Sequence, residues 1–124
     1  MRFSYNELTA ILNIGNAMIM ADGRVDKSET ELLSNELLSF GVSLNDAKKL
    51  MEASVSMRPA EAMTIISSFN YEQKKYVSSF LGTIMASDGD IDERELALWK
   101  LVSAICGLPA MTISEAIDNM CSNG

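Results

Sequence analysis

The sequence predicts an all-α fold: a compact single domain of about seven helices built from a duplicated helix-loop-helix unit. Apolar residues recur at spacings of three and four, which is the helical period, and no stretch alternates convincingly with the period of two that marks a strand. Only two prolines and seven glycines interrupt the 124 residues. The composition, 48% hydrophobic and 22% charged, is that of a folded globular protein. We therefore expect one domain over residues 1–124.

An acidic segment that occurs twice indicates the duplication. Residues 21–29 read Ala-Asp-Gly-Arg-Val-Asp-Lys-Ser-Glu, and residues 87–95 read Ser-Asp-Gly-Asp-Ile-Asp-Glu-Arg-Glu. The two segments are offset by 66 residues, and the same offset also matches residues outside them. The matched pairs, inside and outside the segments, are Phe3/Phe69, Tyr5/Tyr71, Gly23/Gly89, Asp26/Asp92, Glu29/Glu95, Leu32/Leu98 and Gly41/Gly107. One register without a gap predicts an internal repeat over about residues 3–57 and 69–122.

The first half of the chain predicts three helices. Residues 6–20 form the first, and Gly15 within it costs roughly 1 kcal/mol against alanine, which close packing of another helix would explain. Asp26 and Glu29 form a capping box at the start of the second, and Gly41 ends it in a left-handed conformation. Ser43 caps the third. The apolar positions of that third helix, all expected to face inward, are Leu44, Ala47, Leu50, Met51 and Val55.

The second half predicts four more helices. Pro59 suits the first turn of a short connecting helix, and Tyr71 opens a longer one with an apolar stripe on one side. Asp92 and Glu95 repeat the capping box, and Gly107 ends that helix. The polar side of the helix after Tyr71 is expected to carry Lys74, Lys75, Ser78 and Ser79. The inner stripes of the last two helices are expected to be Leu98, Leu101, Val102 and Ile105, and then Ile113, Ala116, Ile117 and Met120.

The charge balance points to cationic or basic partners. The net charge of −7 repels a phosphate backbone, so we expect no nucleic-acid binding. No apolar run reaches the length of a membrane span, and the N-terminus does not read as a signal peptide. These features predict a cytoplasmic protein without direct membrane insertion, and peripheral contact with a membrane protein stays open. Cys106 and Cys121 are too few for a disulfide scaffold and are expected to be reduced, partly buried thiols on core stripes.

The acidic segments admit two interpretations. An aspartate before a helix and a glutamate in its first turn are fully explained as caps. Alternatively, each segment supplies carboxylate oxygens suited to calcium or magnesium. The pattern resembles the second half of an EF-hand loop, but the first and third ligand positions fall on Met18 and Met20 in one copy and on Ile84 and Ala86 in the other, which excludes a standard EF-hand. A shared site requires the two segments to converge. Its candidate ligands are Asp22, Asp26, Glu29, Asp88, Asp92 and Glu95.

Enzymatic chemistry is not expected. The chain has no histidine, which removes the commonest general base and metal ligand. Neither cysteine has a base nearby in the sequence, so both are interpreted as structural. The glycines of the two acidic segments lie beside carboxylates, which is the wrong charge for binding phosphate. We therefore predict no organic cofactor and no catalytic residue.

The two segments, with the apolar helix that ends in Met-Ala-Asp-Gly-Arg-Val-Asp and its counterpart Met-Ala-Ser-Asp-Gly-Asp-Ile-Asp, look like the tellurite-resistance TerB-like family. The likeness covers about residues 6–120. It implies a compact all-α fold, a cytoplasmic role in bacterial stress response or defence beside membrane-bound partners, and divalent-cation binding by the acidic positions. We therefore expect a non-enzymatic, cation-responsive module that acts through protein partners. The alternative is a helical protein-interaction domain whose acidic segments are only helix caps.

Overall fold

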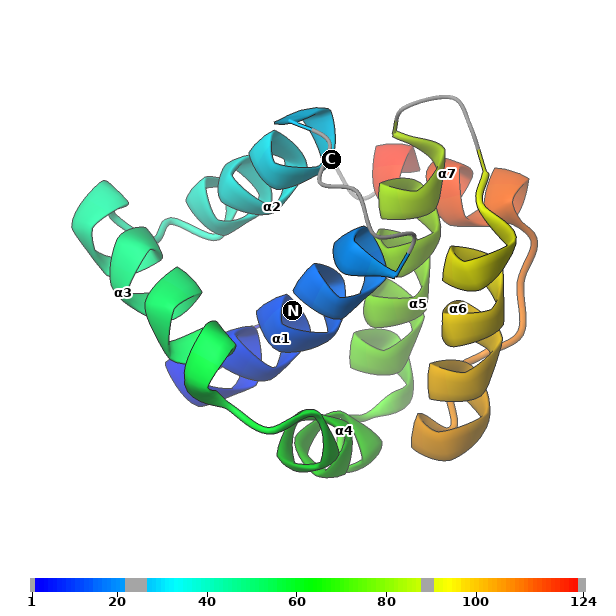
Figure 1. Ribbon diagram of the computed structural model, residues 1–124, viewed down its shortest axis with the longest axis horizontal. Coiled ribbons are helices and arrows are strands. Elements are labelled where there is room, and N and C mark those ends of the chain that lie inside the picture. The colour runs from blue at the N-terminus through cyan, green and yellow to red at the C-terminus, as the bar shows by residue number, and fades with distance from the viewer. Residues whose placement is uncertain (1, 22–26, 88–90, 123–124) are drawn as a thin grey trace.

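The described residues form seven helices, as predicted (Figure 1). The computed structural model describes residues 2–21, 27–87 and 91–122, and these contain no strand. The helices are α1 (Tyr5–Met20), α2 (Lys27–Ser39), α3 (Leu44–Ser56), α4 (Pro59–Ser67), α5 (Tyr71–Ala86), α6 (Glu93–Cys106) and α7 (Ile113–Ser122). The all-α class and the single compact domain are therefore confirmed.

Helices α1 and α5 form the centre of the molecule. Helix α1 packs against α2, α3, α4, α5 and α6, and α5 packs against α1, α6 and α7. Figure 1 shows α2 and α3 on one side of this central pair and α6 and α7 on the other. Both central helices bury nearly every residue over their middle turns. Burial on all sides is expected for a helix that is surrounded by others.

The helix ends follow the predicted local signals. Ser43 accepts a hydrogen bond from the amide of Asp46, which caps α3, and Pro59 is the first residue of α4. Gly41 and Gly107 have φ values of 81° and 70°, the left-handed conformation that glycine adopts at little cost. Helix α1 also begins with a capping box, formed by Ser4 with Glu7.

The helix bounds keep the offset between the two acidic segments. Helices α1 and α5 each have 16 residues, beginning at Tyr5 and Tyr71. Helices α2 and α6 begin at Lys27 and Glu93, with the same separation. The start of α5 also has a capping box, Asn70 with Gln73, where α1 has Ser4 with Glu7. The duplication itself stays a prediction, since equal helix bounds do not establish that the two halves superimpose.

Two glycines allow neighbouring helices to approach the central pair. A Cβ atom added at Gly15 would lie 3.0 Å from Cδ2 of Leu33, so α2 packs closely on α1 there. This close packing explains the glycine in the middle of α1, as predicted. A Cβ atom added at Gly82 would lie 2.6 Å from Cβ of Ala116, which marks the contact between α5 and α7.

Polar contacts join α1 to α3. The Nδ2 atom of buried Asn13 donates to the carbonyl oxygens of Ser54, at 2.8 Å, and Met57, at 2.7 Å. Asn16 donates to Oγ of Ser54 at 3.1 Å, and the Tyr5 hydroxyl donates to Oδ2 of Asp46 at 2.9 Å. One helix thereby supplies partners for the carbonyl groups at the end of another, which intrahelical bonds leave unsatisfied.

The burial pattern corrects several predictions about which face of a helix is covered. Ser78 and Ser79, expected on the polar side of α5, are fully buried, because α7 packs against α5. The expected inward positions that are instead exposed are Leu44, Val55, Leu101, Ile105 and Ile117, with Val55 79% exposed. The spacing of apolar residues identifies the apolar stripe of a helix, but it does not tell which faces of that helix other helices cover.

The two cysteines also differ. Cys106 is buried and its thiol lies 3.5 Å from the carbonyl oxygen of Met63, to which it donates. Burial raises the pKa of this thiol. Cys121 is exposed, which corrects the prediction that it lies on a core stripe. Both are free, as predicted.

Candidate functional site

The acidic segments lie between α1 and α2 and between α5 and α6 (Figure 1). Three of the six predicted metal ligands, Asp22, Asp26 and Asp88, lie outside the described residues. Glu29 belongs to the first turn of α2, but its side chain also lies outside those described. The structure therefore places only Asp92 and Glu95 of the six, both at the start of α6.

Asp92 caps α6, as predicted. Its Oδ1 atom accepts a hydrogen bond from the amide of Arg94 at 2.7 Å, and the Arg94 guanidinium lies beside it, with Nε 3.3 Å from Oδ1. The guanidinium, followed by the amide of the same residue, holds the pKa of Asp92 below its usual range. The amide of Glu95, the donor that a capping box uses, lowers this pKa least.

Glu95 has a different environment from the one that its cap position predicts. It is only 1% exposed, and among the residues whose side chains are described it is the one charged residue that is buried. Its place on α6 explains why, since Trp99 and Val102, four and seven residues later, are also buried. Helical periodicity could have identified this position, because residues separated by four and seven share one face of a helix.

A buried carboxylate is costly unless it is paired, hydrogen-bonded or bound to a metal. Within the part of the chain whose side chains are described, no group of three Asp, Glu or Cys side chains could hold a metal ion. Since four of the six candidate side chains lie outside that part, convergence of the two acidic segments stays a prediction.

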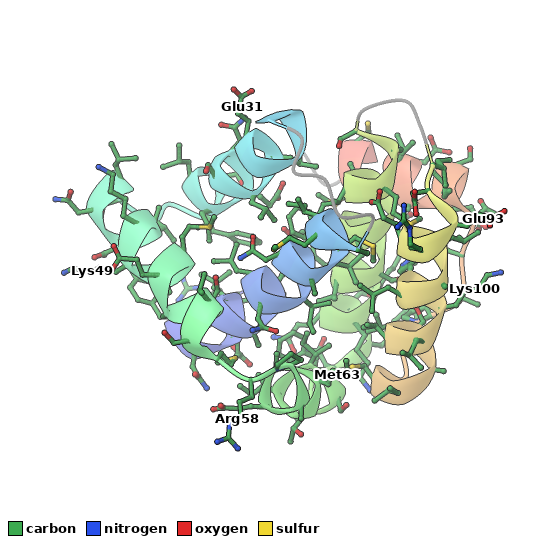
Figure 2. The ribbon with its side chains drawn as sticks, viewed as in Figure 1. Glu31, Lys49, Arg58, Met63, Glu93 and Lys100 are labelled. Carbon is green, nitrogen blue, oxygen red and sulfur yellow. The ribbon has the colours of Figure 1, made fainter. Side chains whose placement is uncertain are left out.

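A groove follows the acidic start of α6 along the same helix. It has a volume of about 410 Å³. Its walls come from α5, α6 and the segment before α7, and are mostly apolar: they comprise Ser78, Leu96, Trp99, Lys100, Ser103, Ala110, Met111, Thr112 and Ile113. Lys100 and Glu93 are exposed on α6 and are labelled in Figure 2. The sequence does not predict this groove, because its walls come from segments that only the fold brings together.

Two hydrogen bonds connect the residues at the base of the groove. The indole Nε1 of Trp99 donates to Oγ of Ser78 at 3.2 Å, and that hydroxyl donates to the carbonyl oxygen of Pro109 at 3.3 Å. They connect α6 to α5 and to the segment that leads into α7. Trp99 is itself buried and belongs to the hydrophobic core.

Comparison with known proteins supports the family that the acidic segments suggested. The family profile described as "Tellurite resistance protein TerB" matches residues 9–117. A crystal structure of a protein of unknown function from Porphyromonas gingivalis W83 is similar at 48% sequence identity and a TM-score of 0.86, covering 97% of this chain and 91% of that one. Among the curated proteins, none matches this chain significantly. No described helix has both the length and the apolar character needed to cross a membrane.

Proposed function

Because the chain belongs to the tellurite-resistance TerB family, we propose that it is a non-enzymatic, divalent-cation-responsive module of stress response or defence that acts through a protein partner in the cytoplasm. Calcium or magnesium is the proposed cation, since both prefer oxygen ligands. The proposed ligand set is Asp22, Asp26, Glu29, Asp88, Asp92 and Glu95. The partner is a protein, which can be membrane-associated, and nucleic acid is not expected.

The observation that carries this proposal is the acidic segment that occurs twice, at residues 21–29 and 87–95. Each copy lies at a helix-to-helix connection and supplies carboxylate oxygens, which calcium and magnesium prefer as ligands. Glu95 corresponds in the predicted internal repeat to Glu29. The net charge of −7 also raises the local concentration of cations at the surface.

Helix α6 connects the proposed cation site to the groove where a partner would bind. Asp92 and Glu95 lie at its start, and Leu96, Trp99 and Lys100 line the groove within the next two turns. A cation that repositions the first turn of α6 would therefore change the groove. An apolar groove of this volume, with Lys100 beside it, suits a short apolar protein segment.

Calorimetric titration of the protein with calcium chloride, and separately with magnesium chloride, tests the proposal. We expect saturable heat and a higher melting temperature, because a ligand at about 100 times its Kd stabilises the folded state by about 2.7 kcal/mol. The double variant Asp22→Asn/Asp88→Asn should lose affinity at least about tenfold. Asp118→Asn, an exposed acid on α7, changes the net charge but should bind as the natural sequence does. Absence of heat and of stabilisation at millimolar metal overturns the proposal.

Arg94 provides a second test at the same site. Its guanidinium already neutralises Asp92, so a cation must compete with it. We expect Arg94→Ala to bind calcium more tightly, with a lower dissociation constant in the same titration. Weaker binding by this variant would show that Asp92 is not a ligand.

The alternative function is a helical interaction domain whose acidic residues are only caps. The bond from the Arg94 amide to Asp92 favours it. In that case Asp92→Ala lowers the melting temperature equally with and without EDTA. Under the cation proposal, EDTA lowers the melting temperature of the natural protein more than that of the variant.

A further inference from the structure

The aromatic side chains of the core gather at one place between α1, α2 and α5. All four phenylalanines of the chain, Phe3, Phe40, Phe69 and Phe80, join Tyr76 there. The ring of Tyr76 lies parallel to that of Phe80, with centroids 6.0 Å apart, and edge-on to that of Phe40, at 5.5 Å. Such arrangements hold rings in fixed positions.

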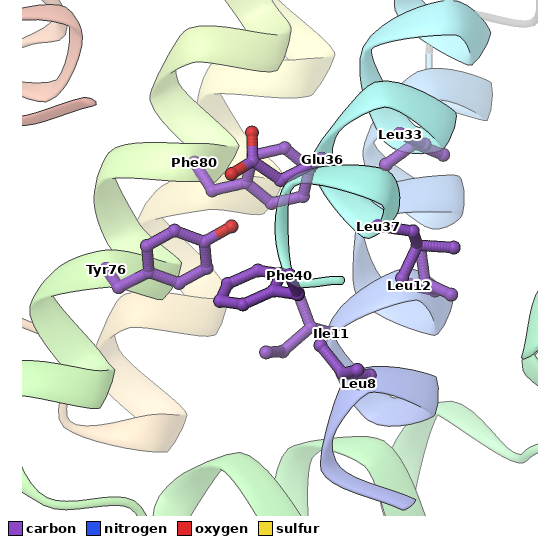
Figure 3. Close-up of a pocket in the computed structure, with 9 residues that line it drawn as sticks. All are labelled: Leu8, Ile11, Leu12, Leu33, Glu36, Leu37, Phe40, Tyr76 and Phe80. Atoms are coloured by element: carbon purple, nitrogen blue, oxygen red, sulfur yellow. The ribbon is translucent and has the colours of Figure 1, made fainter. Parts of the chain in front are cut away.

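A small pocket opens beside these rings (Figure 3). Its volume of about 10 Å³ has room for one group of the size of a water molecule. Buried side chains of α1, α2 and α5 form the floor, and half-buried Glu36 and Phe40 lie at the mouth. The full set is Leu8, Ile11, Leu12, Leu33, Glu36, Leu37, Phe40, Tyr76 and Phe80.

The pocket contains two polar groups, a buried hydroxyl and a half-buried carboxylate, whose capacity to accept hydrogen bonds the surrounding protein fills only in part. Tyr76 is only 5% exposed, and no partner within the described residues lies at hydrogen-bonding geometry to its hydroxyl. Glu36 has only a 3.3 Å contact from Oγ of Ser39, and no basic side chain in the described part of the chain pairs with it. Burial raises the pKa of Tyr76 most, and the charge and the acceptor oxygen of the nearby Glu36 carboxylate raise it further.

We propose that this pocket binds a primary ammonium group, the carboxylate of Glu36 accepting its charge-assisted hydrogen bond and the hydroxyl oxygen of Tyr76 accepting a second. An ammonium has three donors and no acceptor, so two donors serve the two acceptors of this otherwise apolar pocket and the third is left for solvent at the mouth. The aromatic rings beside it add a favourable interaction with a cation.

The chemistry of the pocket excludes other cations. Calcium requires six to eight oxygen ligands, and magnesium requires near-octahedral coordination, whereas Glu36 and Tyr76 offer two side chains. A guanidinium is planar and larger than the space of one water molecule. A primary ammonium group is compact and enters on a flexible chain.

This inference is separate from the proposed function. The pocket shares no residue with the acidic start of α6 or with the groove that follows it. A protein that fails to bind calcium can therefore still bind an ammonium, and the reverse holds as well.

Titration with n-butylammonium chloride, followed by NMR of the backbone amides, tests the inference. The probe is the side chain of lysine without its backbone. We expect saturable shifts at Glu36, Phe40 and Tyr76, with a Kd of about 1–50 mM because so small a ligand can gain only a limited affinity. Sodium chloride at equal concentration and neutral n-butanol serve as controls that should not saturate.

Three variants make the test specific. Glu36→Gln keeps the shape of the side chain but removes its charge, and should weaken binding about tenfold or more. Tyr76→Phe should weaken it about threefold to tenfold. Glu52→Gln, an exposed acid on α3, is the matched control and should leave binding unchanged. Circular dichroism confirms that each variant is folded.

A second probe identifies the source of the ammonium. Nα-acetyl-lysine methylamide presents the same group with a peptide backbone. Tighter binding of this probe than of n-butylammonium supports a lysine of a partner protein, and equal binding supports a free amine. Absence of saturation, equal binding of n-butanol, or an unchanged affinity in Glu36→Gln overturns the inference, in which case a single water molecule between Tyr76 and Glu36 is the occupant.

Discussion

Gly82 lies where α5 and α7 come closest, and the surrounding atoms leave no room for a side chain. An added Cβ would meet Cβ of Ala116 at 2.6 Å and the ring of Trp99 at 3.1 Å. Neither can rotate away, because one is fixed to its backbone and the other is hydrogen-bonded to Ser78. At Gly15 the nearest atom, 3.0 Å away, is the end of the Leu33 side chain, which has more freedom.

Gly82→Ala is therefore expected to destabilise the protein by about 1–3 kcal/mol, although alanine favours a helix by roughly 1 kcal/mol over glycine. The free energy of unfolding in urea measures this loss. Gly15→Ala is the matched comparison and should cost less. Adding Ala116→Gly to Gly82→Ala should recover part of the stability. A stability of Gly82→Ala equal to or above that of the natural sequence would contradict the contact.

At the scale of the elements, hydrogen bonds from polar side chains hold α1 and α3 together more than buried apolar area does. Helix α3 buries only Ala47, Leu50 and Ser54. Its C-terminal end is held by Asn13, whose two hydrogen bonds reach the carbonyls of Ser54 and Met57. These bonds connect helices that are far apart in the sequence, so they determine where α3 docks.

Asn13→Ala should lower the free energy of unfolding by about 2 kcal/mol, because it leaves two carbonyl groups without their donor. Hydrogen exchange should accelerate most in α3. Asn16→Ala removes only one bond, to Oγ of Ser54, and should cost less than about 1 kcal/mol. An equal effect of the two variants would show that the bonds of Asn13 do not control the docking of α3.

At the scale of the whole molecule, titratable groups define a window of stability. The pKa of Asp92 and that of Glu115 are lowered in the folded state, mainly by Arg94 and by the amide of Thr112 respectively. The pKa of Tyr76 is raised by burial and that of Tyr5 by its hydrogen bond to Asp46. Lowered acid values favour folding above the unfolded pKa, and raised tyrosine values favour it below the unfolded pKa.

The melting temperature is therefore expected to fall on both sides of a plateau. On the acid side the loss begins below the unfolded carboxylate values of 3.8 and 4.5 and continues through the folded ones. On the alkaline side it begins above 10.0, where an unfolded tyrosine ionises but Tyr76 does not. Thermal melts across this range measure both limbs. Tyr76→Phe should flatten the alkaline limb but not the acid one, and an unchanged alkaline limb would contradict the burial of this hydroxyl.

Local signals in the sequence were enough to place the helices. Ser43, Pro59, Gly41 and Gly107 act where the chain begins or ends a helix, and each does so through its own backbone or the next few residues. The family was also recognisable, because each of the two acidic segments is an unbroken stretch of the sequence. The cap at Asp92 was predicted for the same reason, although its principal donor is the amide of Arg94, two residues on, and not the predicted one three residues on.

The sequence by itself therefore determined the helical class, the helix ends and the family, all of which depend on interactions within a few residues. Only the tertiary structure decided which helix face is covered, as the exposed Val55 and the buried Ser79 show. It also decided that Glu95 is buried and that Tyr76 faces Glu36 across a small pocket. These features depend on segments far apart in the chain, and the physical reason is that burial is a property of the neighbours and not of the residue.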